Sequence, residues 1–188
     1  RVSKHYPSKV VVELVYRKPA AMVEVRMQDK PGLLPVDGHG VLLPPEDFTP
    51  KEANEEFPRI SVGNSVPAGP VGTAWGDPKV TGAARIAQAL GERWKDLKLH
   101  MILVAADGGT TRHGEPIYEL STKGKTRILW GHAPGEESSQ EATAIQKAAR
   151  LSQFVSEQGP LDGPSGPREI DVRDGQVRLQ ARTARAAP

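Results

Sequence analysis

The stretch Arg168-Glu-Ile-Asp-Val-Arg173, Asp174-Gly175, Gln176-Val-Arg-Leu-Gln-Ala-Arg182 has the pattern of a β-hairpin. Its two alternating runs flank Asp-Gly, a pair that favours the two-residue turn in which both positions take positive φ. Only residues 183–188 follow, so we expect no later strand to cover the second arm. A free outer strand offers unpaired N–H and C=O groups to an extended partner. The hairpin therefore predicts a sheet edge that binds another strand.

The second arm of this hairpin is the candidate partner-binding segment. Its apolar residues alternate with polar ones, which predicts one face toward the core and one toward solvent. We expect Val177, Leu179 and Ala181 on the core face and Gln176, Arg178, Gln180 and Arg182 on the polar face. Basic residues on an outer strand can also serve only to prevent aggregation. Partner binding and edge protection are thus both open interpretations.

The remaining strands are predicted from β-branched runs bounded by turn residues. Residues 10–16 and 21–27 read as strands, and residues 2–4 as an antiparallel neighbour of the first. Residues 33–36 and 41–43 bracket a tight turn, and 99–106, 117–122 and 126–130 are further strands.

Capping signals predict the helices. Thr49-Pro-Lys-Glu52 is a capping box that starts a short helix, ended at Phe57-Pro58. Asp77-Pro78 begins a longer helix, whose apolar stripe runs from Val80 to Leu97 over about five turns. Ser138-Ser-Gln-Glu141 is predicted to open the last helix, and 59–76 is predicted to be a long loop. The fold class is α+β, with a largely antiparallel sheet and two main helices.

Composition argues against several functional classes. The chain of 188 residues has a net charge of +2, with mixed basic and acidic residues and three each of Phe, Trp and Tyr. This balance does not favour a nucleic-acid surface, which needs clustered basic and aromatic side chains. Cysteine is absent, which excludes disulfides, thiolate metal sites and cysteine nucleophiles.

No motif points to catalysis, a metal or a cofactor. The five histidines, at 5, 39, 100, 113 and 132, show no metal-ligand spacing, and the glycine-rich segments lack the ending of a P-loop. We therefore expect a protein that is not an enzyme. A hydrolase around His113 or His132 would lack partner residues in the sequence.

Trp75 is the candidate surface anchor. It lies in the Gly- and Pro-rich segment 59–76, where an exposed ring could stack on a ligand. An extracytoplasmic module that binds a small molecule or peptidoglycan through this loop is the alternative function. Packing of the Trp75 ring onto the core is the competing interpretation.

The order of short motifs resembles the FtsQ/DivIB cell-division family. Val36-Asp-Gly-His-Gly-Val-Leu-Leu43 is similar to the family's valine-aspartate turn, and Ile170-Asp-Val-Arg173 to its near-terminal strand. The other segments that carry the resemblance are Tyr6-Pro7 with 10–20, 57–60 with 68–72, 126–131 and 148–151. Together they span nearly the whole chain in the family's order. Trp130-Gly-His132 departs from the usual Leu-Gly-Arg.

The resemblance implies a domain organisation and a function. Residues 1–19 would be the last hairpin of a truncated POTRA-like domain, 20–183 an FtsQ-like β domain and 184–188 a tail. Members of the family are non-enzymatic divisome scaffolds on the periplasmic side of the inner membrane, anchored by an upstream helix. They bind the small bitopic proteins FtsL and FtsB, and the partner strand adds to the last β-strand, here 176–182. We expect no cofactor and no nucleic-acid partner.

Overall fold

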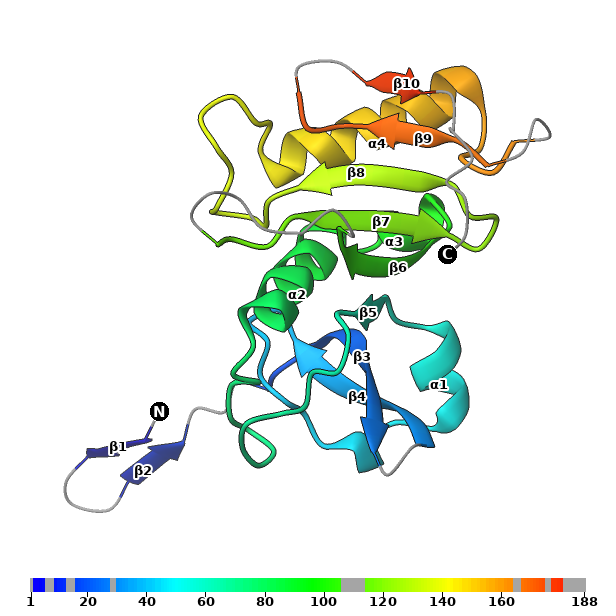
Figure 1. Cartoon of the computed structure of the whole chain (residues 1–188). Helices are drawn as coiled ribbons and strands as arrows, with labels where there is room; N and C mark the ends of the chain where they lie inside the picture. The colour runs from blue at the N-terminus through cyan, green and yellow to red at the C-terminus, as the bar shows by residue number, and fades with distance from the viewer. Residues whose placement is uncertain are drawn as a thin grey trace.

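The fold is described from a computed structural model of the chain (Figure 1). The structure describes residues 2–5, 9–12, 16–27, 30–105, 114–163, 167–174 and 177–180. Within these residues, eight strands form one sheet and two more form a separate hairpin. The class is α+β, as the sequence predicts.

The large sheet has the strand order β10-β9-β8-β7-β6-β5-β3-β4. Its strands are β3 (Pro19–Met27), β4 (Lys30–Asp37), β5 (Arg59–Ser61), β6 (Leu99–Val104), β7 (Tyr118–Thr122), β8 (Arg127–Gly131), β9 (Glu169–Asp171) and β10 (Arg178–Gln180). The pairs β3–β4, β6–β7, β7–β8 and β9–β10 are antiparallel. The pairs β3–β5, β5–β6 and β8–β9 are parallel. The sheet is therefore mixed, with antiparallel pairs in the majority.

The segment 59–76, predicted to be a loop, contains the strand β5. The prediction was wrong for Arg59–Ser61 because three residues are too few to show alternation. Ile60 is fully buried between β3 and β6. This short strand joins the two halves of the sheet.

Helix α1 (Pro50–Glu55) starts as predicted. The Thr49 side chain accepts the N–H of Glu52, and the Glu52 carboxylate accepts the N–H of Thr49 at 2.9 Å. A single turn of 3-10 helix, η1 (Pro45–Asp47), precedes it.

Helix α2 (Pro78–Leu90) also starts as predicted, because Asp77 Oδ1 accepts the N–H of Lys79. The prediction of one continuous helix to Leu97 was wrong. Gly91 takes φ +51 and ends α2, and α3 (Arg93–Asp96) is a separate turn. Both pieces still bury their apolar faces, so the stripe persists although the helix does not.

Helix α4 (Ala144–Gln158) starts later than predicted. The box at Ser138–Glu141 does not cap it. Thr143 accepts the N–H of Gln146, and the Gln146 side chain accepts the N–H of Thr143 at 3.0 Å. The Glu141 carboxylate is instead turned toward the protein interior, where it meets Lys147 and His132.

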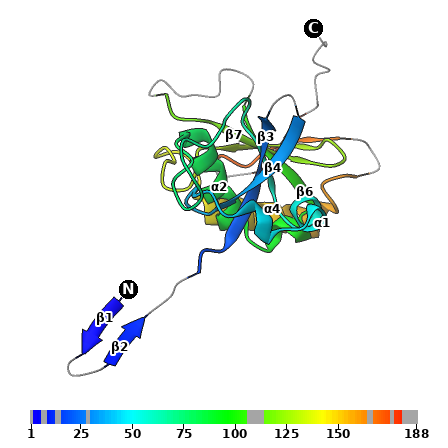
Figure 2. The same ribbon diagram turned by 90° about the horizontal axis from the view of Figure 1, so that it is seen from below.

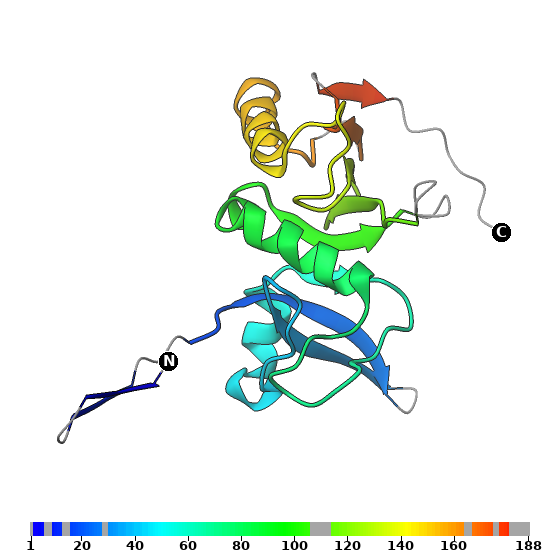
Figure 3. The ribbon, with the colours of Figure 1, turned by 90° about the vertical axis from the view of Figure 1, so that its left-hand side faces the viewer.

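The core lies between the sheet and the helices α2 and α4. Helix α2 packs on β3, β5 and β6 and contacts α4 (Figure 3). The sheet contributes Val23, Ile60, Ile102, Leu120, Ile128 and Ile170, and the helices contribute Val80, Ala84, Leu90, Ala148 and Leu151. No helix in the described part of the chain is long and apolar enough to cross a membrane.

The hairpin of β1 (Val2–His5) and β2 (Lys9–Val12) forms its own two-stranded sheet, as the sequence predicts. It lies apart from the eight-stranded sheet (Figure 2). The division at residue 19 and the identification of the two parts as POTRA and β domains stay predictions. Residues 181–188, which include the proposed tail, lie outside the described residues.

Candidate partner-binding edge

Strand β10 is the outermost strand at one end of the sheet (Figure 1). Its register with β9 is antiparallel, with Arg178 opposite Asp171, Leu179 opposite Ile170 and Gln180 opposite Glu169. The predicted candidate residues Val177, Arg178, Leu179 and Gln180 therefore lie on this edge. The other three, Gln176, Ala181 and Arg182, lie outside the described residues.

The backbone of β10 points alternately toward β9 and away from the sheet. Arg127 donates its N–H to Arg168 O at 2.9 Å, and Val172 donates to Leu129 O at 3.3 Å, so the even-numbered positions of β9 face β8. Hydrogen-bonding direction alternates along a strand. The odd-numbered positions of β9 therefore face β10.

It follows that Arg178 and Gln180, opposite Asp171 and Glu169, direct their backbone groups inward. Leu179 lies between them and directs its N–H and C=O outward. The outward groups of an unpaired strand are those that an added strand would bind.

The opposite edge, β4, is protected from strand addition. Met22 donates its N–H to Pro58 O at 2.8 Å, so the even-numbered positions of β3 face β5. The β4 residues opposite them therefore point outward, and these are Pro31, Leu33 and Pro35. Proline has no N–H to donate. Two of these three positions thus cannot donate, and the next outward position, Asp37, already donates its N–H to Val41 O at 3.0 Å. Described β10 contains no proline.

Side chains on one face of β10 border a groove against α4. The groove has a volume of about 600 Å³, and Phe154 of α4 and Val177 and Leu179 of the edge contribute its apolar surface. Val177 packs on the core, as predicted for the apolar face. Leu179 is 55% exposed. Its side chain lies on the same face of the strand as Val177, as predicted, but the core does not cover it.

Ion pairs and side-chain bonds hold the hairpin in place. Arg150 of α4 donates to the backbone oxygens of Val172, at 3.3 Å, and Asp174. Arg173 Nη2 lies 2.6 Å from Asp171 Oδ2. Burial alone would raise the pKa of Asp171, but the hydrogen bonds from Arg173 outweigh it and the pKa lies below its usual value. The edge is therefore fixed from both the helix and the turn.

Trp75 is not a surface anchor, and this prediction was wrong. Its side chain is fully buried, and the indole Nε1 donates to Ser65 Oγ at 2.9 Å. The backbone of Trp75 donates to Gly40 O at 2.8 Å. The ring thus fastens the loop to the core, and the alternative function of a glycan-binding loop loses the side chain on which it rested.

A buried ionic cluster is the feature that the sequence did not predict. Lys147 Nζ lies 2.5 Å from Glu141 Oε1, and these side chains are 0% and 6% exposed. His132 Nδ1 contacts the other carboxylate oxygen of Glu141, and the N–H of His132 donates to Glu141 Oε1 at 2.8 Å. The Lys147 ammonium also lies 5.2 Å from the centre of the Trp130 ring.

The electrostatics of the cluster follow from its burial. Burial alone would raise the pKa of Glu141, but bonds from Lys147 and His132 outweigh it, so the pKa lies below its usual value. Burial lowers the pKa of Lys147, and Glu141 opposes that shift. The sequence signal for this cluster is a lysine within the apolar stripe of α4, between Ala144 and Leu151.

One of the two histidines considered for hydrolysis has a carboxylate partner. His132 has a partner in Glu141, contrary to the expectation that it would lack one, and Glu115 Oε2 lies 3.9 Å from its Nε2. His113 lies outside the described residues. Among the described residues, no group of three or more histidines and carboxylates could hold a metal ion.

No protein-family model and no curated protein matches this chain.

Proposed function

We propose that this protein is a non-enzymatic scaffold that binds a partner by strand addition to β10. The observation that supports the proposal most strongly is the difference between the two sheet edges. Leu179 has an outward N–H and C=O on an outer strand without proline, whereas two outward positions of β4, Pro31 and Pro35, have no N–H to donate. Strand addition needs such free donors and acceptors, and alternating side-chain contacts supply specificity.

The biological role rests on the motif resemblance. The ordered similarity to the FtsQ/DivIB family suggests a divisome scaffold on the extracytoplasmic side of the cytoplasmic membrane. Its partners would be FtsB- or FtsL-like bitopic proteins. The near-terminal motif contributes to β9, and β10, the outer strand, follows it directly in the sequence, which agrees with this role.

The test is co-purification with the FtsB-like protein encoded in the same genome. Leu179→Pro removes the outward N–H without removing a donor that pairs with β9, so partner recovery should fall by about tenfold or more. Leu179→Thr keeps the N–H and introduces a β-branched side chain that suits a strand, and it should retain binding. Leu33→Pro makes the same substitution at the outward position of the opposite edge, and it should also retain binding.

All three variants are first compared with the parent by circular dichroism and thermal unfolding. A folded Leu179→Pro protein that binds as the parent does would refute the proposal. Equal losses in Leu179→Pro and Leu33→Pro would also refute it, because the effect would then not be specific to β10.

A further inference from the structure

The sheet opens between β3 and β5. Strand β5 pairs with β3 only at Met22 and Val23 and then leaves it. Strand β3 continues from Glu24 to Met27, and over these residues its pairing partner is β4. The second half of β3 therefore has an unpaired side that faces the departing β5.

Backbone groups point into this opening. Because Met22 donates its N–H to the backbone oxygen of Pro58, the residue just before β5, the even-numbered positions of β3 face β5. Arg26 is the next even-numbered position beyond Glu24, and its partner in β4 is Pro31. The N–H and C=O of Arg26 are therefore directed into the opening.

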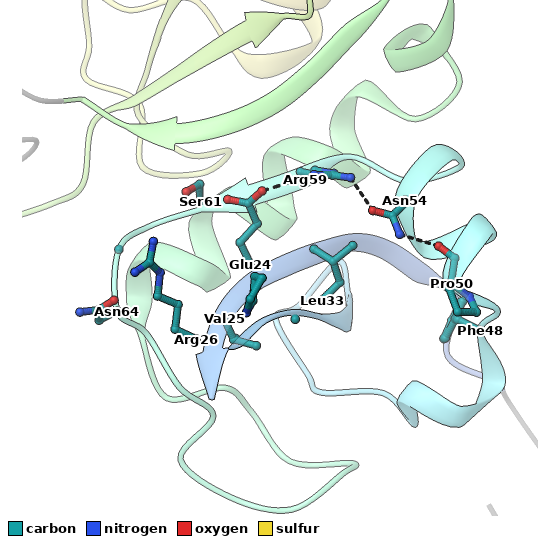
Figure 4. Close-up of a pocket in the computed structure, with 13 residues that line it drawn as sticks. Glu24, Val25, Arg26, Leu33, Phe48, Pro50, Asn54, Arg59, Ser61 and Asn64 are labelled. Carbon is teal, nitrogen blue, oxygen red and sulfur yellow. Dashed lines mark hydrogen bonds and ion pairs between the residues drawn. The ribbon is translucent and has the colours of Figure 1, made fainter. Parts of the chain in front are cut away.

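A cavity of about 770 Å³ lies at the opening (Figure 4). Arg26, Ser61 and Asn64 gather at one end of it, and Leu33 and Phe48 lie toward the other. The cavity thus combines a polar end with an apolar surface along one strand.

Positive charge exceeds negative charge in this cavity. Arg59 Nη2 donates to Asn54 Oδ1 at 2.6 Å, and its Nη1 lies 3.6 Å from Glu24 Oε1. The Arg59 Nε is buried and has no hydrogen-bond acceptor among the described residues. Arg26 is exposed and has no ion-pair partner in the described part of the chain. The lining of the cavity therefore carries two guanidinium groups and one carboxylate, and that carboxylate is paired with Arg59.

The neighbouring His100 responds to the same charge. Burial lowers its pKa, and the Arg59 guanidinium lowers it further. At His100 the effect of the Arg59 charge is larger than the opposing effect of Glu24.

We propose that this opening is a second peptide-binding site, which takes an extended segment with an acidic side chain. The segment would pair with Arg26 through the backbone, as in strand addition. Its carboxylate would lie beside the Arg26 guanidinium, and an apolar side chain two residues along, on the same face, would lie on Leu33 and Phe48. The site lies near the β4 end of the sheet, far from β10 in the strand order, so it does not depend on the function proposed above.

The test uses the blocked hexapeptide Thr-Thr-Glu-Thr-Leu-Thr, in which Glu and Leu share one face. Titration into isotope-labelled protein should shift the backbone amide signals of residues 24–27 and 61–64. The same peptide with Gln in place of Glu should bind about tenfold more weakly, because it has no carboxylate.

Arg26→Glu should weaken binding of the Glu peptide by about tenfold, because it replaces an attraction by a repulsion. Lys30→Glu is the matched control, because it makes the same charge change in the neighbouring strand at a residue that does not line the cavity. The affinity of this variant for the Glu peptide should stay within about twofold of that of the parent.

Four results would overturn the proposal: no shifts at residues 24–27 at millimolar peptide, equal affinity for the Glu and Gln peptides, equal losses in the two variants, or shifts confined to residues 177–180. The last of these would assign the peptide to the β10 edge.

Discussion

Replacement of Glu141 by alanine should lower the free energy of unfolding by about 3–5 kcal/mol, the usual cost of leaving a buried charge without its partner. The Lys147 side chain is fully buried and lies 2.5 Å from the Glu141 carboxylate. Without that carboxylate, the nearest remaining acceptor of the ammonium is His132 O, at 3.5 Å. The N–H of His132 would lose its acceptor as well.

Urea unfolding followed by circular dichroism measures the loss, and the midpoint of thermal unfolding should fall by about 6–20 °C. Glu157→Ala is the matched control, because Glu157 is an exposed carboxylate near the end of α4. It should change stability by less than about 0.5 kcal/mol.

The double variant Glu141→Leu with Lys147→Met separates charge from packing. An apolar pair of similar size should recover at least about half of the loss, because no buried charge remains unpaired. A loss below about 1 kcal/mol in Glu141→Ala would refute the reasoning. It would mean that Lys147 reaches water or gives up its proton at little cost.

Two further predictions concern the same part of the fold. Acid should destabilise the protein. The folded-state pKa values of Glu141 and Asp171 lie below the ordinary values of 4.5 and 3.8. The contribution of these two carboxylates to stability is therefore complete above the ordinary values and is lost as the pH falls through the folded-state values. Urea unfolding from pH 7 to pH 3 should show this decline, and Glu141→Gln should flatten it; a slope unchanged by that substitution would contradict the assignment. Gly131→Ala should cost about 2 kcal/mol or more, since position 131 has φ +91 and an added Cβ would lie 2.0 Å from Glu141 Oε1. Thermal unfolding measures this cost, and an unchanged midpoint would exclude the close approach of Glu141 to Gly131.

Local signals in the sequence predicted most of the secondary structure. The turn residues between alternating runs placed the terminal hairpin, and side-chain caps at Thr49 and Asp77 placed the starts of two helices. These signals succeed because each acts within a few residues of the element that it defines.

The errors arose where tertiary contacts decide between local alternatives. Ser138–Glu141 and Thr143–Gln146 both have the spacing of a capping box, and the second forms because the carboxylate of Glu141 pairs with Lys147 instead. Gly91 ends α2, although apolar spacing continues beyond it. Strand β5 is held by neighbours on both sides rather than by its own three residues.

The position of the candidate site could be predicted from the sequence, but the backbone groups that it leaves free could not. The sequence indicated an outer strand, and the structure places β10 there. Which backbone groups of β10 are free depends on its register with β9 and on the register of β9 with β8. The blocked opposite edge depends in the same way on pairing between β3 and β4. Register of this kind is a property of the whole sheet.

Amide hydrogen exchange at β10 tests strand addition most directly. In the free protein, the outward N–H of Leu179 should exchange readily, while the inward N–H groups of Arg178 and Gln180 should be protected by β9. Saturation with the FtsB-like partner should protect Leu179 and leave the alternation at its two neighbours in place. A complex that forms while the exchange rate at Leu179 stays unchanged would contradict the account.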